Sequence, residues 1–195
     1  TTFAVEFAMN SGQTATMQTS MKASSWKITS GTLDAGTNRL SPDNNTAGQG
    51  DFTISAGATV ISSATGTTGS AVIGRSSNGT TGYAGTLTVA GTLILGGASP
   101  TVAMNSVVLT GTVEYSGAGQ TLLAATGGGT APSSYTNLVT SGSGTKTLSS
   151  ATSISGAGSV VGAGTTLSTG AFTLTNNGTR LVNGTFQIAQ GGWGG

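Results

Sequence analysis

The acidic side chains are the groups in this sequence that could do chemistry, because it has no histidine and no cysteine. The carboxylates are Glu6, Asp34, Asp43, Asp51 and Glu114. Enzymes that cleave polysaccharides use clustered carboxylates, with cations or Ca²⁺, to move protons at the sugar. Asp34 and Asp51, with Arg39 between them, become neighbours if successive turns of a coil stack, and Asp43-Asn44-Asn45 is a weaker Ca²⁺ candidate. We interpret these acids as solvated turn residues, and therefore expect no enzyme activity and no metal site.

The composition excludes most other site chemistry. Without His or Cys the 195-residue chain has no imidazole base, thiolate nucleophile or disulfide. Six Lys+Arg against five Asp+Glu give a net charge of +1, too small a field to attract nucleic acid or an anionic membrane. The glycine run at 127–129 lacks the following Lys-Ser/Thr of a phosphate loop, so we expect no cofactor. Apolar windows such as 93–95 and 107–109 are too short for membrane insertion.

Alternation of apolar and small or polar residues predicts strands rather than helices. Phe3, Val5, Phe7 and Met9 share one face of a period-2 segment at the N-terminus. The same pattern recurs in short segments that end in Gly, Asn or Ser: residues 26–29, 52–55, 87–89, 172–175 and 186–188. No segment keeps helical spacing over three turns. The sequence therefore predicts an all-β fold.

A recurring phrase, Gly-Thr followed by an apolar residue, indicates how the strands are arranged. It occurs at 31–33, 85–87, 91–93, 111–113 and 184–186, with a longer copy at 178–181. Glycine suits a sharp corner, and the apolar residue that follows can point into a core. Repetition of one corner and one strand favours a β-solenoid, and the uneven spacing favours an irregular parallel β-helix with loops at its corners. A β-sandwich, which also has short strands, is the alternative.

Two segments carry a resemblance to known proteins. Residues 135–148, Tyr-Thr-Asn-Leu-Val-Thr-Ser-Gly-Ser-Gly-Thr-Lys-Thr-Leu, and residues 111–117, Gly-Thr-Val-Glu-Tyr-Ser-Gly, resemble repeats of large secreted bacterial adhesin-like proteins. The resemblance spans about residues 85–188. It implies a β-rich, parallel β-helical body outside the cell, and it implies no catalytic residues.

The two chain ends suggest how the protein associates. We divide the chain into an N-terminal assembly strand at residues 1–10, one β-rich body at 11–190 and a glycine-rich tail at 191–195. The first strand is strongly amphipathic, and so few charges are available that the edges of an open β body are poorly guarded. We predict that this strand packs onto or into a neighbouring subunit. The predicted assembly interface comprises Phe3, Val5, Phe7, Met9 and Trp193.

These observations predict an extracellular or cell-surface structural subunit that self-assembles head to tail into a filament or surface matrix. The alternative is an adhesin or carbohydrate-binding module of a larger surface protein, which would need an exposed aromatic platform. Trp26, Tyr83 and Tyr115 are the candidates for that platform. The chain also carries Asn-x-Ser/Thr sequons, where glycans could shield a surface of low charge. The candidate glycosylation sites are Asn44, Asn78, Asn177 and Asn183.

Overall fold

The computed structural model describes residues 3–42, 50–66, 71–74, 85–126, 129–189 and the backbone of 193–194. Within these residues the chain forms strands and no helix, as predicted. All strand pairs within these residues are parallel. Parallel stacking is consistent with a β-solenoid and differs from the antiparallel sheets of a sandwich.

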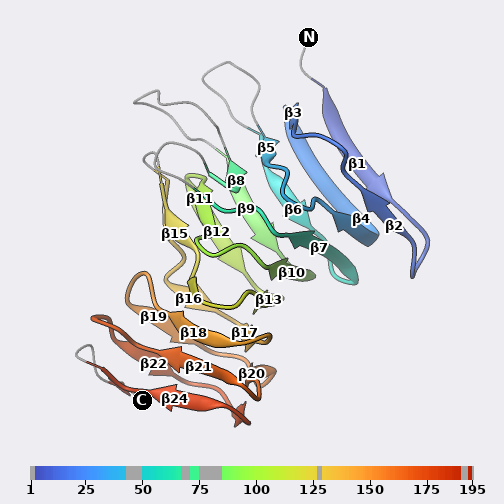
Figure 1. The fold of residues 1–195 in the computed structure, drawn as a ribbon. Coiled ribbons are helices and arrows are strands. Elements are labelled where there is room, and N and C mark those ends of the chain that lie inside the picture. Colours follow the sequence, from blue (N-terminus) through green and yellow to red (C-terminus); the bar gives the residue numbers. More distant parts are fainter. Residues whose placement is uncertain are drawn as a thin grey trace.

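The strands follow one another around successive turns that stack along the long axis (Figure 1). The first four turns contain β1 (Ala4–Ala8), β2 (Thr14–Thr16), β3 (Met21–Ala23), β4 (Ser25–Asp34), β5 (Leu40–Pro42), β6 (Phe52–Ile54), β7 (Ala58–Ser62), β8 (Ile73–Gly74), β9 (Thr86–Val89), β10 (Thr92–Leu95) and β11 (Thr101–Ala103). The next turns contain β12 (Ser106–Leu109), β13 (Thr112–Tyr115), β14 (Gln120–Thr121), β15 (Ala124–Ala125), β16 (Ser134–Tyr135), β17 (Asn137–Thr140) and β18 (Gly144–Thr147). The last contain β19 (Thr152–Ile154), β20 (Ser159–Val161), β21 (Thr165–Ser168), β22 (Leu174–Asn176), β23 (Arg180–Val182), β24 (Thr185–Gln187) and β25 (Trp193–Gly194).

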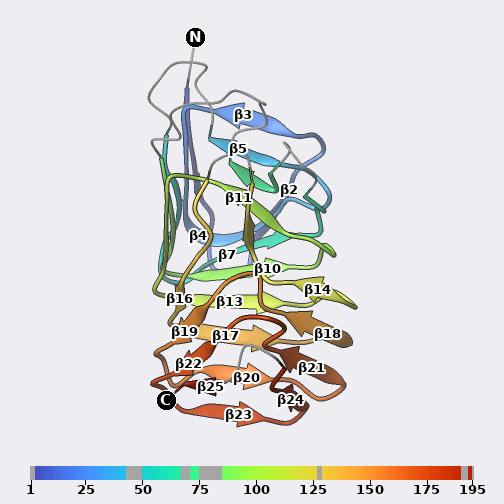
Figure 2. The same cartoon turned by 90° about the vertical axis from the view of Figure 1, so that its left-hand side faces the viewer.

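One face of the coil runs through the whole described structure. We call it the long face; its order is β2, the second half of β4, β7, β10, β13, β17, β20 and β23 (Figure 2). The other faces change partway along. The sheet β3-β5-β8-β11-β15 gives way to β14-β18-β21-β24, and the face containing β1, β6, β9 and β12 is followed by β16-β19-β22-β25. The long face is therefore the continuous element of the fold.

The register of the long face explains the repeated Gly-Thr phrase. An outward column of threonines passes through paired positions from Thr14 to Thr112: Thr14, Thr32, Thr59, Thr92 and Thr112. The residue after each threonine points inward: Ala15, Leu33, Val60, Leu93 and Val113. A glycine precedes Thr32, Thr92 and Thr112 and lies at the corner, whereas Gln13 and Ala58 take this place before Thr14 and Thr59. Gly31 has φ +75°, and a Cβ at Gly111 would collide with the Gly91 carbonyl, so these corners require glycine.

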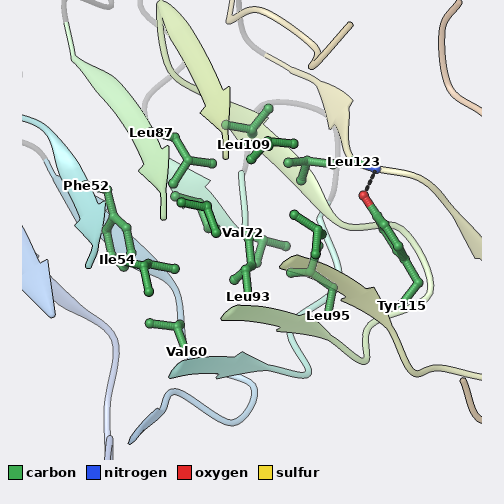
Figure 3. Close-up of a cluster of buried hydrophobic side chains, with 14 of the residues drawn as sticks. Phe52, Ile54, Val60, Val72, Leu87, Leu93, Leu95, Leu109, Tyr115 and Leu123 are labelled. Carbon is green, nitrogen blue, oxygen red and sulfur yellow. Dashed lines mark hydrogen bonds between the residues drawn. The ribbon is translucent and has the colours of Figure 1, made fainter. Parts of the chain in front are cut away.

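The core of the first turns is apolar and includes an aromatic stack. Trp26 lies between Phe7 and Phe52, with ring centroids 6.1 and 6.0 Å away, and its indole Nε1 donates to the Ser41 carbonyl at 3.2 Å. Figure 3 shows further side chains that meet between the faces, including Leu93 and Leu95 of the long face. Stacking places like residues above one another, so each turn buries its side chains against the next.

The core of the later turns contains satisfied polar groups. The hydroxyl oxygens of Tyr115 and Tyr135 are 2.8 Å apart, and the Leu123 N–H donates to Tyr115 (Figure 3). Burial raises the pKa of both tyrosines well above the usual value of 10.0. Lys146 is fully buried, and its ammonium donates to the carbonyls of Gly117, Ala118 and Ser143. These bonds replace the hydration that burial removes.

Candidate assembly surfaces at the two ends of the coil

The first turn presents free strand edges. Within the described residues β1 and β2 pair only with β4, and β3 pairs only with β5. These strands lie together at the N-terminal end of the coil (Figure 1). A free edge leaves backbone N–H and C=O groups available to another strand. This end is therefore chemically able to accept a further turn.

The inward side chains of the first turn are apolar but only half-buried. Val5, Phe7, Ala15, Met17 and Met21 pack on one side against the core. Phe7 is the last ring of the aromatic stack and lies almost parallel to Trp26, at an interplanar angle of 14°. Its inner face covers Trp26, while no ring in the described residues covers its outer face. The end of the coil thus exposes part of its core.

The last turn shows the same condition at the opposite end. Within the described residues β23 pairs only with β20, and β24 only with β21. Val182 is 45% exposed, whereas Val161, directly beneath it in the same inward column, is 2% exposed. Other large apolar side chains exposed in this part of the chain are Phe172, Leu181 and Ile188. The last turn therefore also presents core-type residues to solvent.

A cation lies on the inward side of the last turn. The Arg180 guanidinium carbon is 5.4 Å from the centroid of the Phe186 ring, within cation–π distance. Arg180 is half-buried, and desolvation lowers the pKa of its guanidinium group. Phe186, which pairs with the buried Leu167, is itself half-buried. The arginine side chain thus covers part of an aromatic ring at this end.

The structure places the predicted interface residues at both ends of the coil. Phe3 is 54% exposed, and Val5, Phe7 and Met9 are half-buried. Val5 and Phe7 belong to β1, which pairs in parallel with β4. The backbone of Trp193 pairs with Leu174 in β22, and its side chain lies outside the described residues. The predicted segments 1–10 and 191–195 thus include strands that join the stacked body, β1 and β25.

The sequence pattern does not reveal the other residues of these ends. Met17 and Met21 at the N-terminal end, and Val182 and Phe186 at the C-terminal end, were not assigned to the interface. The alternation Arg180-Leu181-Val182 is too short to stand out as a strand. The signal lies in the register, since Val182 continues a column that is buried in the preceding turns.

The acidic residues do not gather into a site. Asp34 ends β4 and accepts a bond from the Gly36 N–H, while Asp51 lies beside the beginning of the same strand and accepts from Thr86. The two carboxylates therefore lie at opposite ends of β4, and stacking does not bring them together. Arg39 is half-buried, and its backbone N–H donates to Ser20. Among the described residues no group of three or more His, Cys, Asp or Glu side chains could hold a metal ion. Asp43, in the weaker Ca²⁺ candidate, lies outside them.

The aromatic platform of the alternative function is not formed by the residues proposed for it. Trp26 is 1% exposed and Tyr115 is 0% exposed, so neither can stack on a sugar in solution. Tyr83 lies outside the described residues. These aromatic residues are core residues wherever the structure describes them.

The sequons are described at two positions. Asn177 and Asn183 are exposed in the segments that flank β23, and their backbone N–H groups donate to the carbonyls of Ile154 and Val161. Both side chains are accessible to modification. Asn44 and Asn78 lie outside the described residues.

Comparison with known proteins gives no relative: no family model, curated protein or solved structure matches the chain. No helix in the described part of the chain has the length and hydrophobicity of a membrane span.

Proposed function

We propose that this chain is a β-solenoid subunit that stacks end to end with copies of itself to form an extracellular or cell-surface filament or matrix. The observation that carries the proposal is the abrupt change in exposure at the last turn, from 2% at Val161 to 45% at Val182. In this proposal the chain has a structural function, which depends on backbone pairing and apolar burial and not on catalysis.

The physical reason is that both ends resemble interior turns without a neighbour. Solenoids ordinarily need terminal units with a polar outer surface to remain soluble. Here the half-buried residues at the N-terminal end include Phe7 and Met17, while at the C-terminal end Val182 is exposed and Phe186 is half-buried. Because the two ends are different surfaces, their contact is heterologous, and a stacked contact that does not close generates an open filament.

The charge distribution supports association between copies. With 6% charged residues and a net charge of +1, the chain has little long-range repulsion to keep subunits apart. Low net charge is normally avoided on soluble surfaces because it promotes association. Asn177 lies in an Asn-x-Ser/Thr sequon, and a glycan there would shield the side of such a filament in an extracellular setting.

Sedimentation velocity and negative-stain electron microscopy of the purified chain would test the proposal. We expect oligomers that grow with concentration, and filaments about as wide as one solenoid. The decisive variant is Val182→Asp, which places a carboxylate in the inward column at the free end. The junction would remove this carboxylate from water into an apolar column, which is unfavourable, so filaments should be lost.

Val108→Asp is the matched control. Val108 is 40% exposed, close to the 45% of Val182, but it lies in β12, in the middle of the coil. Filaments should persist in this variant. A wild-type chain that stays monomeric at every concentration, or equal loss of filaments in both variants, would contradict the proposal.

A further inference from the structure

We infer that the long face continues across the junction, with β23 of one copy pairing in parallel with β2 of the next copy. This inference rests on the proposed function and adds the strands, their direction and their register. The partner is thus a second copy of this chain, bound by extension of a sheet.

The long face is the element that can continue because it reaches both ends. Within the described residues the long face passes unbroken from β2 to β23, and these two terminal strands each have one unpaired edge. The other sheets change strand sets midway, so their first and last strands belong to different sheets. All strands of the long face are parallel, so addition of β2 to β23 keeps both the direction and the hydrogen-bond pattern.

The columns of the long face fix the register. Arg180 pairs with Ser159, which continues the inward column that starts at Ala15 and runs through Leu33. Val182 continues a second inward column through Val161. Met17 begins this column: its N–H donates to the Asp34 carbonyl, which extends the parallel pairing of β2 and β4 by one residue. In the junction Arg180 therefore faces Ala15, and Val182 faces Met17. Leu181 then faces Thr16 on the outer side.

The side chains suit this register. Arg180 is the longer of the two inward side chains of β23, and it meets the small side chain of Ala15 in β2. The ring of Phe186 already holds the guanidinium group to one side. Val182 and Met17, half-buried or exposed in the single chain, would cover each other. A slip by one residue would turn the apolar column outward, so the inward pattern specifies the register.

Disulfide trapping tests this register, because the chain has no cysteine of its own. Leu181 is 57% exposed and Thr16 is exposed, so both tolerate substitution. Neighbouring strands are about 4.8 Å apart, which lies within the Cα–Cα range of a disulfide. Under mild oxidation the double variant Leu181→Cys/Thr16→Cys should form a covalent ladder of oligomers on a non-reducing gel.

Leu181→Cys/Thr14→Cys is the register control. Thr14 points outward like Thr16 but lies two residues away, which puts the pair on a diagonal of about 7–8 Å. That separation exceeds what a disulfide spans, so the in-register pair should cross-link at least about tenfold faster. Each single-cysteine variant should give no ladder.

The outcomes separate this inference from the proposed function. If filaments form but the Thr14 pair cross-links as fast as the Thr16 pair, the register is wrong while end-to-end assembly stands. Rapid dimerisation of Thr16→Cys alone would indicate contact between like ends and would overturn the inference. If no filaments form, the proposed function itself fails.

Discussion

The interior turns and the terminal turns use the same kinds of side chain in different surroundings. Trp26 and Phe52 are at most 1% exposed, while Phe7, which stacks on Trp26, is half-buried. Val161 and Val182 differ in the same way at the other end. Within each of these comparisons both side chains are apolar, so the difference in exposure arises from the missing neighbour. A second copy would supply that neighbour.

The largest effect should come from the interior of the aromatic stack. Replacing Trp26 with Ala removes a fully buried ring and its hydrogen bond to Ser41, so the free energy of unfolding should fall by about 3–5 kcal/mol. Phe7→Ala, at the end of the stack, should lower the free energy of unfolding by about 1–2 kcal/mol, because the ring is only half-buried. Urea denaturation in the monomeric Val182→Asp background measures both. Equal losses would remove the distinction between interior and end.

The next effect concerns the polar interior of the later turns. Lys146→Met leaves the carbonyls of Gly117, Ala118 and Ser143 without their donor, and we expect a loss of about 2–3 kcal/mol. Lys22→Met, on the exposed side of β3, is the matched control and should change stability by less than about 0.5 kcal/mol. Denaturation in the same background compares the two. A Lys146 variant as stable as its control would show that those carbonyls need no donor.

A smaller effect at neutral pH, with a clear pH signature, comes from the tyrosine pair. Burial raises the pKa of Tyr115 and Tyr135 above 10.0, so the folded chain holds these protons more tightly than the unfolded chain. The contribution of the protonated tyrosines to the free energy of unfolding is complete below pH 10. It is lost as the pH rises above 10, by about 1.4 kcal/mol per pH unit for each tyrosine. Tyr135→Phe should cost about 1 kcal/mol at pH 7 and then show a shallower alkaline decline. Denaturation between pH 8 and about pH 12 measures the slope; parallel curves would contradict the assignment.

The smallest effect is expected from the surface ion pair between the first two turns. Glu6 lies 3.4 Å from Lys27, and both side chains are more than half exposed. Glu6→Gln should reduce stability by less than about 0.5 kcal/mol, and added salt should remove the difference. Denaturation at low and high salt checks this. A loss above about 1 kcal/mol would mean that charge, rather than apolar stacking, holds the first turn in place.

The sequence was sufficient for the strands and corners and insufficient for the site. Alternation at Phe3–Met9 and the Gly-Thr phrase at 31–33 depend on local sterics, which a single segment reveals. The position of Asp34 relative to Asp51 depends on how β4 passes from one face of the coil to the next, and this path cannot be predicted from the local sequence. The importance of Val182 depends on its pairing with Val161, a register set across a whole turn.

Electron microscopy of the purified wild-type chain, reconstructed at a resolution that separates strands, tests the central claim most directly. We expect filaments in which the strand spacing of about 4.8 Å continues through each junction from β23 to β2. Single particles the size of one coil at every concentration, with both terminal edges facing solvent, would contradict it.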